Sequence, residues 1–202
     1  MDINNLQNLP REILEQLVKI PGFILPGEWT SKNGVLLPCK VDAEVALKNK
    51  ENIDANTLMG LIKYKCSEKG LDFSSYDTFI GIETGGWSFA QRLQAITKIP
   101  AIKMNKETYE IAGRPGKNVL FIDDVLATGT SLTNGFRKLT DNHHIQHMDT
   151  LVMYDYELAT LLINRGGHHV SLSTRKDLIW ALVKNKSVHL AESLRNLQTD
   201  SN

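Results

Sequence analysis

The sequence predicts an α/β fold in which a mainly parallel, twisted sheet is flanked by helices. Stretches with strand and helix patterns alternate from Thr78 onward, which is typical of parallel sheets. Residues 119–123 are apolar up to the first acid, as expected of a strand covered on both faces. Hydrophobic residues make up 42% of the 202 positions, which is enough for a sizeable core. We therefore expect one domain of ordinary size.

The N-terminal part contains two predicted helices and one predicted strand. Residues 10–19 have one apolar face and begin at Pro10, which suits a first helical turn. Prolines and glycines between 21 and 27 then predict a break, and 34–41 predict a short edge strand. Residues 54–69 predict a second helix, with Asp54 as N-cap, Gly70 as stop, and a buried face made of Leu58, Leu61, Ile62 and Cys66.

The remaining elements follow in regular order. Strands are predicted at 78–82, 100–104, 119–123, 150–154 and 169–173. Helical spacing of apolar residues predicts helices near 89–96, 132–139, 157–165 and 176–184. The segment after Asn185 is polar enough to fray, although Leu190, Leu194 and Leu197 also have helical spacing. No internal repeat is present.

Charge and cysteine content exclude several classes of function. Lys plus Arg total 23 and Asp plus Glu total 23, so the chain has no general attraction for nucleic acid or anionic membranes. Cys39 and Cys66 are too few for a disulfide framework, and neither lies in a CxxC motif. The N-terminus lacks the pattern of a signal peptide, and no apolar stretch approaches the ~18 residues that span a bilayer. We expect a cytoplasmic protein.

The segment 119–132 carries the strongest chemical signal. Its apolar strand ends in two adjacent acids, Asp123 and Asp124, and a short turn precedes the next helix. Ligands of open parallel sheets bind beyond the carboxyl ends of the strands, which is where this turn is expected to lie. The turn consists of small and hydroxyl residues: Ala127, Thr128, Gly129, Thr130 and Ser131.

These residue types suit a sugar phosphate. A helix start offers unpaired N–H groups and a partial positive charge, and Gly129 lets the backbone approach an anion closely. The two carboxylates would repel the phosphate but can accept hydrogen bonds from ribose hydroxyls. A buried strand with an ordinary capped turn explains one acid and one hydroxyl, but poorly explains two acids, three hydroxyls and a glycine in nine positions.

This segment resembles the phosphoribosyl-pyrophosphate signature of type I phosphoribosyltransferases. The resemblance implies that fold, with a small hood formed by the two ends of the chain. It also implies that Asp123 and Asp124 contact ribose hydroxyls, while 127–131 holds the 5′-phosphate. Within a single domain covering 1–202, we expect a hood segment at 1–42, an α/β core at 43–184 and a tail at 185–202.

The wider chain is most similar to orotate phosphoribosyltransferase. Residues 22–34 resemble its N-terminal segment, which contributes to the base pocket, and this makes Trp29 a candidate for stacking on a base. Residues 81–90 lie where that family binds pyrophosphate, which makes Thr84, Gly85 and Gly86 candidates; a tight strand-to-helix turn that needs glycine explains them equally well. Residues 105–107 resemble the start of the loop that covers the active site, and 173–182 resemble the closing strand and helix.

Departures from that family fall on its cations. The loop has Asn105, Tyr109 and Ile111 where the family has arginine, lysine and histidine, so Lys106 is the remaining candidate for a catalytic cation. Tyr156 stands where the family supplies the arginine that binds orotate, and a tyrosine ring can stack on a base without pairing with a carboxylate. The connection at 113–118 is also short.

Two histidines four residues apart are the other candidate for chemistry. His143, His144 and His147 follow the expected end of a helix, where a polar turn is several times more common than a metal site. We therefore expect no metal bound directly by protein side chains.

The leading interpretation is a Mg²⁺-dependent enzyme that transfers ribose 5-phosphate from phosphoribosyl pyrophosphate to a nucleobase-type acceptor. The magnesium is expected because the diphosphate is densely charged. The alternative is a non-catalytic regulatory module that binds phosphoribosyl pyrophosphate or a nucleotide. By resemblance we expect a homodimer, and from the balanced charge and the lack of a long apolar stretch we expect no membrane or nucleic-acid partner.

Overall fold

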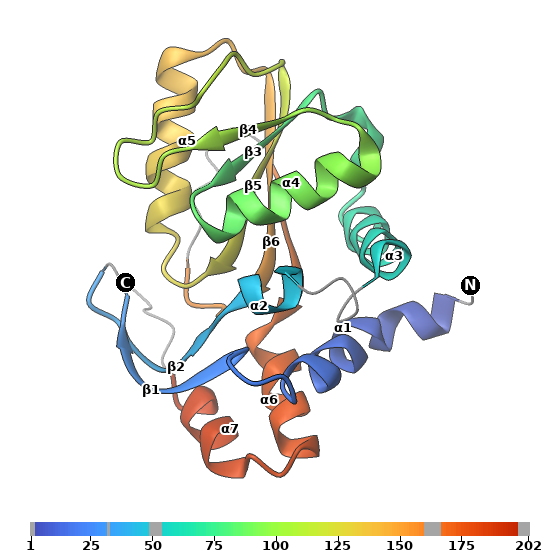
Figure 1. Cartoon of the computed structure of the whole chain (residues 1–202), viewed down its shortest axis with the longest axis vertical. Helices are drawn as coiled ribbons and strands as arrows, with labels where there is room; N and C mark the ends of the chain where they lie inside the picture. Colours follow the sequence, from blue (N-terminus) through green and yellow to red (C-terminus); the bar gives the residue numbers. More distant parts are fainter. Residues whose placement is uncertain (1–2, 32, 49–53, 160–166, 198–202) are drawn as a thin grey trace.

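The computed structural model describes residues 3–31, 33–48, 54–159 and 167–197. Its centre is a sheet of five parallel strands in the order β4-β3-β5-β6-β7 (Figure 1). The strands are β3 (Thr78–Ile82), β4 (Ala101–Met104), β5 (Asn118–Leu126), β6 (His147–Asp155) and β7 (His169–Thr174). The predicted α/β class and parallel sheet are confirmed.

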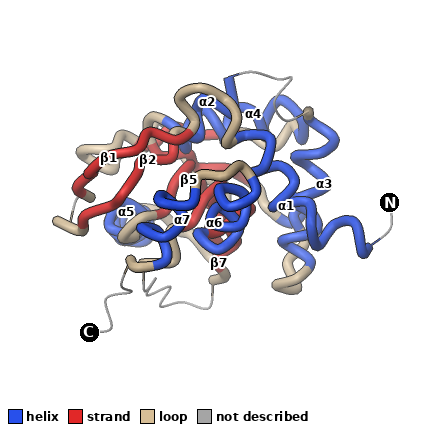
Figure 2. Tube along the Cα trace, turned by 90° about the horizontal axis from the view of Figure 1, so that it is seen from below, coloured by secondary structure: helices blue, strands red, loops and turns tan. Residues whose placement is uncertain are grey.

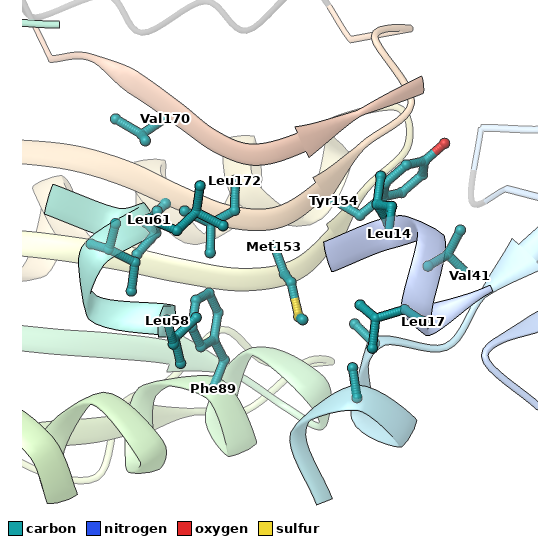
Figure 3. Packing of buried hydrophobic residues seen from close by; sticks show 14 of the residues in the cluster. Leu14, Leu17, Val41, Leu58, Leu61, Phe89, Met153, Tyr154, Val170 and Leu172 are labelled. Atoms are coloured by element: carbon teal, nitrogen blue, oxygen red, sulfur yellow. The ribbon is translucent and has the colours of Figure 1, made fainter. Parts of the chain in front are cut away.

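Alternate residues along the strands face two different clusters, as strand geometry requires. Helix α5 (Thr130–Asn142) covers one face, where Leu132 and Leu139 pack on Ile80 and Phe121. The other face is covered by α3 (Ala55–Ser67) and α4 (Gly85–Thr97). Side chains from α1 (Ile3–Leu17), α3 and α4 meet strand residues in the core that Figure 3 shows: Leu14, Leu17, Leu58, Leu61, Phe89, Met153 and Leu172.

A two-stranded antiparallel hairpin lies beside this core. Its strands are β1 (Ile24–Thr30) and β2 (Leu36–Val41), and short helix α2 (Ala43–Lys48) follows. Figure 2 shows the hairpin on the opposite side of the molecule from α1 and α3. Helices α6 (Arg175–Lys184) and α7 (Val188–Arg195) pack against each other, and α7 also contacts β2.

The N-terminal predictions need two corrections. The first helix begins at Ile3, so Pro10 lies inside it instead of in its first turn. Proline removes one backbone donor there, and packing of neighbouring Leu9 and Ile13 against the core offsets that loss. The predicted break at 21–27 is correct for Pro21 and Gly22, which lie in turns, but wrong for Pro26 and Gly27, because β1 runs through them with a bulge between Pro26 and Trp29.

Other boundaries differ less. Strand β5 continues to Leu126, because Val125 and Leu126 keep pairing with Tyr154 and Asp155 of β6; the acids therefore lie inside the strand and not at its end. Asp54 caps α3 as expected, and the predicted buried face of α3 is confirmed. The predicted helix at 157–165 falls mainly on residues outside the described part, and the described residues 157–159 are not helical.

The segment after Asn185 does not fray within its described part. It forms α7, in which Ala191 and Leu194 are buried, so the helical spacing of its leucines was the better guide. Helix α6 begins with a capping box between Thr174 and Asp177, which fixes where β7 ends and the helix starts.

Candidate functional site

A cavity of about 400 Å³ lies at the carboxyl ends of β3 and β5. One side is formed by the end of β5 and the turn into α5, and another by the start of α4. Residues of the hairpin β1–β2 and of the start of α2 also line it. The cavity brings together nearly all residues that the sequence singled out: Trp29, Thr84, Gly85, Lys106, Asp123, Asp124, Ala127, Thr128, Gly129, Thr130, Ser131 and Tyr156.

The two adjacent acids differ in their surroundings. Asp123 is buried, whereas Asp124 is half-buried, and the Asp124 backbone N–H donates to Asp123 Oδ1 at 3.0 Å. Burial raises the pKa of Asp123 well above its ordinary value, and the charge of Asp124 raises it further, while Lys106 opposes both. A ligand hydroxyl that donates to this pair would relieve part of the cost of burying the charge.

Gly85 and Gly86 allow α4 to lie directly against the acids. A Cβ on Gly85 would meet Asp124 Oδ2 at 1.9 Å, and one on Gly86 would meet the Asp123 Cα at 2.8 Å. Close packing therefore explains both glycines, and it also puts the amino end of α4 beside the Asp124 carboxylate. Thr84 is the N-cap of α4 but makes no side-chain capping bond, and the Glu83–Thr84 peptide is cis.

The turn into α5 leaves its backbone donors open. Gly129 is the N-cap with φ of 77°, the left-handed region that favours glycine, and α5 has no side-chain capping bond there. Thr128 Oγ1 and Thr130 Oγ1 lie 3.1 Å apart. Uncapped N–H groups, two hydroxyls and the dipole of a helix converge at this point, which suits a phosphate group.

Lys106 lies in a compact loop that follows β4. Asn105 Oδ1 accepts hydrogen bonds from the N–H groups of Glu107 and Thr108, at 2.8 and 2.9 Å. The loop then turns back, so that Ile111 bridges to Met104. Lys106 lines the cavity, whereas Lys103 of β4 pairs with Glu83 at 2.6 Å.

Trp29 and Tyr156 lie on the hairpin side of the cavity and differ in accessibility. Trp29 is 39% exposed, and its indole N–H donates to the Leu25 carbonyl at 3.0 Å. Tyr156 is 1% exposed, and its hydroxyl donates to the Cys39 carbonyl at 2.8 Å. Trp29 thus offers an open ring for stacking, whereas Tyr156 offers at most an edge of its ring to a ligand.

Comparison with solved structures identifies the fold. Orotate phosphoribosyltransferase from Aeropyrum pernix superposes with a TM-score of 0.69 and 24% identity, covering 86% of this chain and 98% of that one. Leishmania donovani UMP synthase gives a TM-score of 0.71 and 19% identity over 92% of this chain, which spans 41% of that protein. Orotate phosphoribosyltransferase from Mycobacterium tuberculosis in complex with phosphoribosyl diphosphate gives a TM-score of 0.61 and 17% identity. The match covers 84% of this chain and 98% of that one.

The chain has the type I phosphoribosyltransferase fold. No protein-family model matches the sequence, and comparison with curated proteins finds no match either. The phosphoribosyltransferase fold thus emerges from the structure, in agreement with the resemblance seen at 119–132.

Three cavity residues on the hood side of the phosphoribosyltransferase fold were missed from the sequence. Lys40 lies 5.6 Å above the ring of Trp29, and Asp42 and Glu44 add two carboxylates to the same wall. Glu44 Oε1 accepts from Ser88 Oγ at 3.2 Å, which ties α2 to α4. No sequence pattern marks these residues, because they reach the cavity only through the pairing of β1 with β2 and the position of α2.

The histidine cluster lies away from this cavity. His147 and Asp149 begin β6, at the amino end of the strand whose carboxyl end faces the site. His147 Nε2 and the Tyr76 hydroxyl both lie 2.6 Å from Asp149 Oδ2, and Asp149 is fully buried. This cluster links β6 to the segment before β3.

Among the described helices, none is long and apolar enough to cross a membrane.

Proposed function

We propose that the chain transfers ribose 5-phosphate from phosphoribosyl pyrophosphate to a nucleobase-type acceptor and releases pyrophosphate. The observation that carries the proposal is the shared cavity, in which the Asp123–Asp124 pair faces the uncapped start of α5. The acids suit the ribose hydroxyls, and 127–131 suits the 5′-phosphate. The Mycobacterium tuberculosis protein of this fold in complex with phosphoribosyl diphosphate supports the choice of donor.

Each group in the cavity has a role in this proposal. The acid pair orients the ribose, and Trp29 stacks on the acceptor base. Lys106 is the cation best placed to stabilise the charge that grows on the departing pyrophosphate. Thr84 and Gly85 line the cavity at the start of α4 and would face the pyrophosphate, whereas Gly86 packs against Asp123 and is not one of the lining residues.

Magnesium would enter with the donor. Among the described residues, no group of three His, Cys, Asp or Glu side chains is arranged to hold a metal ion. The half-buried Asp124 leaves a carboxylate open to the cavity, which suits a divalent ion bound mainly by diphosphate oxygens and water. Bound Mg²⁺ would neutralise diphosphate charge and polarise the bond to the leaving group.

A regulatory module that binds the same ligand without catalysis is the second candidate. The compact loop after β4 favours it, because Lys106 is the one cation of that loop segment, 105–111, that lines the cavity. For either function we infer a cytoplasmic homodimer built from one domain, with no membrane or nucleic-acid partner. Light scattering coupled to gel filtration tests the dimer.

A product assay separates the two functions. Purified protein is incubated with phosphoribosyl pyrophosphate and a panel of bases, with and without Mg²⁺, and nucleotide and pyrophosphate are measured. The enzyme proposal predicts product with at least one base, and Lys106→Ala should lower turnover by about 10²–10³ while calorimetric binding of the donor persists. Lys138→Ala, an exposed change on α5, is the control. Tight binding without product from any base would favour the regulatory module.

A further inference from the structure

The tip of the hairpin is hydrogen-bonded to the phosphate turn. Thr130 Oγ1 donates to Asn33 Oδ1 at 2.7 Å, and these residues are 97 positions apart in the chain. The tip also has internal backbone hydrogen bonds. The Ser31 N–H donates to the Val35 carbonyl at 2.8 Å, and the Gly34 N–H donates to the Ser31 carbonyl at 3.0 Å. These bonds of Ser31, Gly34 and Val35 support the position of Asn33 beside Thr130.

The count of protons shows what this contact does in the free protein. A threonine hydroxyl carries one proton, and that of Thr130 is given to Asn33. Thr128, 3.1 Å from Thr130, must then donate to the Thr130 oxygen. In the free protein both hydroxyl protons consequently point toward Asn33 and away from the place where the phosphate is proposed to bind.

A bound phosphate reverses this chain. Phosphate oxygens are acceptors, so Thr130 must turn its proton to the ligand and leave an oxygen lone pair facing Asn33. An asparagine side chain can meet both states, because its amide carries an acceptor and an NH₂ donor on opposite sides. Half a turn of that amide lets Nδ2 donate to Thr130 and strengthens the donation of Thr130 to the charged ligand.

We propose that Asn33 is a positioning residue for the 5′-phosphate, which acts through Thr130 and clasps the hairpin over the occupied turn. This inference rests on the proposed function, because it assumes that 127–131 receives the phosphate. Asn33 is exposed and lies outside the core, so substituting it tests the contact without emptying the interior.

The test replaces Asn33 by aspartate, which has the acceptor oxygen of asparagine but not its NH₂ donor. Asn33→Asp keeps the acceptor that holds Thr130 in the free protein but has no donor for the bound state. Asn33→Ala removes both, and Leu36→Asp adds the same charge at an exposed position of the same hairpin. For each variant, the melting temperature without ligand and the Kd for ribose 5-phosphate are measured at 0.15 M and 1 M NaCl.

We expect Asn33→Asp to melt like the wild type and to bind ribose 5-phosphate at least about tenfold more weakly, as loss of a hydrogen bond that supports a charged ligand predicts. The deficit relative to wild type should persist at 1 M NaCl, where the effect of added charge is screened and Leu36→Asp should match wild type. Asn33→Ala should melt lower and bind with intermediate affinity.

The outcomes separate this inference from the function on which it rests. Wild-type protein that binds neither ribose 5-phosphate nor phosphoribosyl pyrophosphate contradicts the proposed function itself. Wild-type protein that binds, together with Asn33→Asp of equal affinity, overturns the role of Asn33 and leaves the proposed function standing. A purely structural contact would make affinity follow melting temperature, with Asn33→Asp equal to wild type in both.

Discussion

Tyr154 and Tyr156 pack edge to face, with ring centroids 4.8 Å apart, but their hydroxyl groups differ in hydrogen bonding. Tyr156 donates to the Cys39 carbonyl, whereas the buried Tyr154 hydroxyl has no hydrogen-bond partner among the described residues. Burial raises the pKa of both phenols, so each stays neutral at physiological pH.

These tyrosines give a matched pair of substitutions. Tyr154→Phe removes an unsatisfied buried hydroxyl and should raise the free energy of unfolding by about 1 kcal/mol. Tyr156→Phe leaves the Cys39 carbonyl without that donor and should lower it by about the same amount. Urea denaturation of both variants measures the difference; equal effects would contradict the hydrogen-bond assignment.

Asp123 should stabilise ligand binding at the expense of folding. Its folded pKa is raised, so its stability contribution is complete below the unfolded pKa, about 3.9, and is lost as pH rises through the folded pKa. Asp123→Asn should therefore be more stable than wild type at pH 7, with a gap that closes toward pH 3.

The same variant should lose affinity for ribose 5-phosphate, because an amide is a weaker acceptor for ribose hydroxyls than a carboxylate. Asp141→Asn makes the same change at an exposed site on α5 and should alter neither property. Chemical denaturation across pH and calorimetry measure both effects. A variant that is less stable than wild type at pH 7 would refute the argument.

Gly85→Ala should disturb the acid pair. The new Cβ would lie 1.9 Å from Asp124 Oδ2, so the carboxylate or α4 must move, at a cost of about 1–3 kcal/mol in stability. Ribose 5-phosphate should also bind more weakly. Gly60→Ala, in the interior of α3 with open space around the added atom, should instead raise stability by about 0.5–1 kcal/mol.

Orotate should be a poor acceptor. Tyr156 is a buried neutral residue where the resemblance places an arginine, and the carboxylates of Asp42 and Glu44 outnumber Lys40, the cation of the same wall. A carboxylate without a cationic partner is costly to bury. Steady-state turnover of orotate should fall far below the ~10 s⁻¹ that is typical of enzymes. Ordinary turnover would instead direct alanine substitution to Arg114, Lys117 and Arg175.

The predictable part of the fold is the part with unbroken local patterns. Residues 79–82 of β3 and 119–122 of β5 are continuously apolar, and Asp54 and Gly70 mark the ends of α3 in the sequence itself. Strand β1 could not be predicted, since its Pro26 and Gly27 are ordinary signs of a loop and only pairing with β2 makes it a strand. The start of α1 was missed because packing outweighs one internal proline.

The candidate site divides in the same way. Asp123, Asp124 and 127–131 could be predicted because they are adjacent in sequence. Asn33, Lys40 and Glu44 could not, because their place depends on how a hairpin docks onto a turn nearly a hundred residues away. Tyr156 is buried against Cys39, which lies 117 positions away along the chain.

One consequence of this layout concerns divergence. The proposed ribose and phosphate contacts all come from one uninterrupted stretch, from Asp123 in β5 to Ser131 in α5, so they can be inherited together as a block. The base and leaving-group contacts are drawn from separate segments, and each can change by single substitutions without disturbing that block. Proteins that diverge on this fold can thus change their acceptor, or lose catalytic activity altogether, and still bind the sugar phosphate.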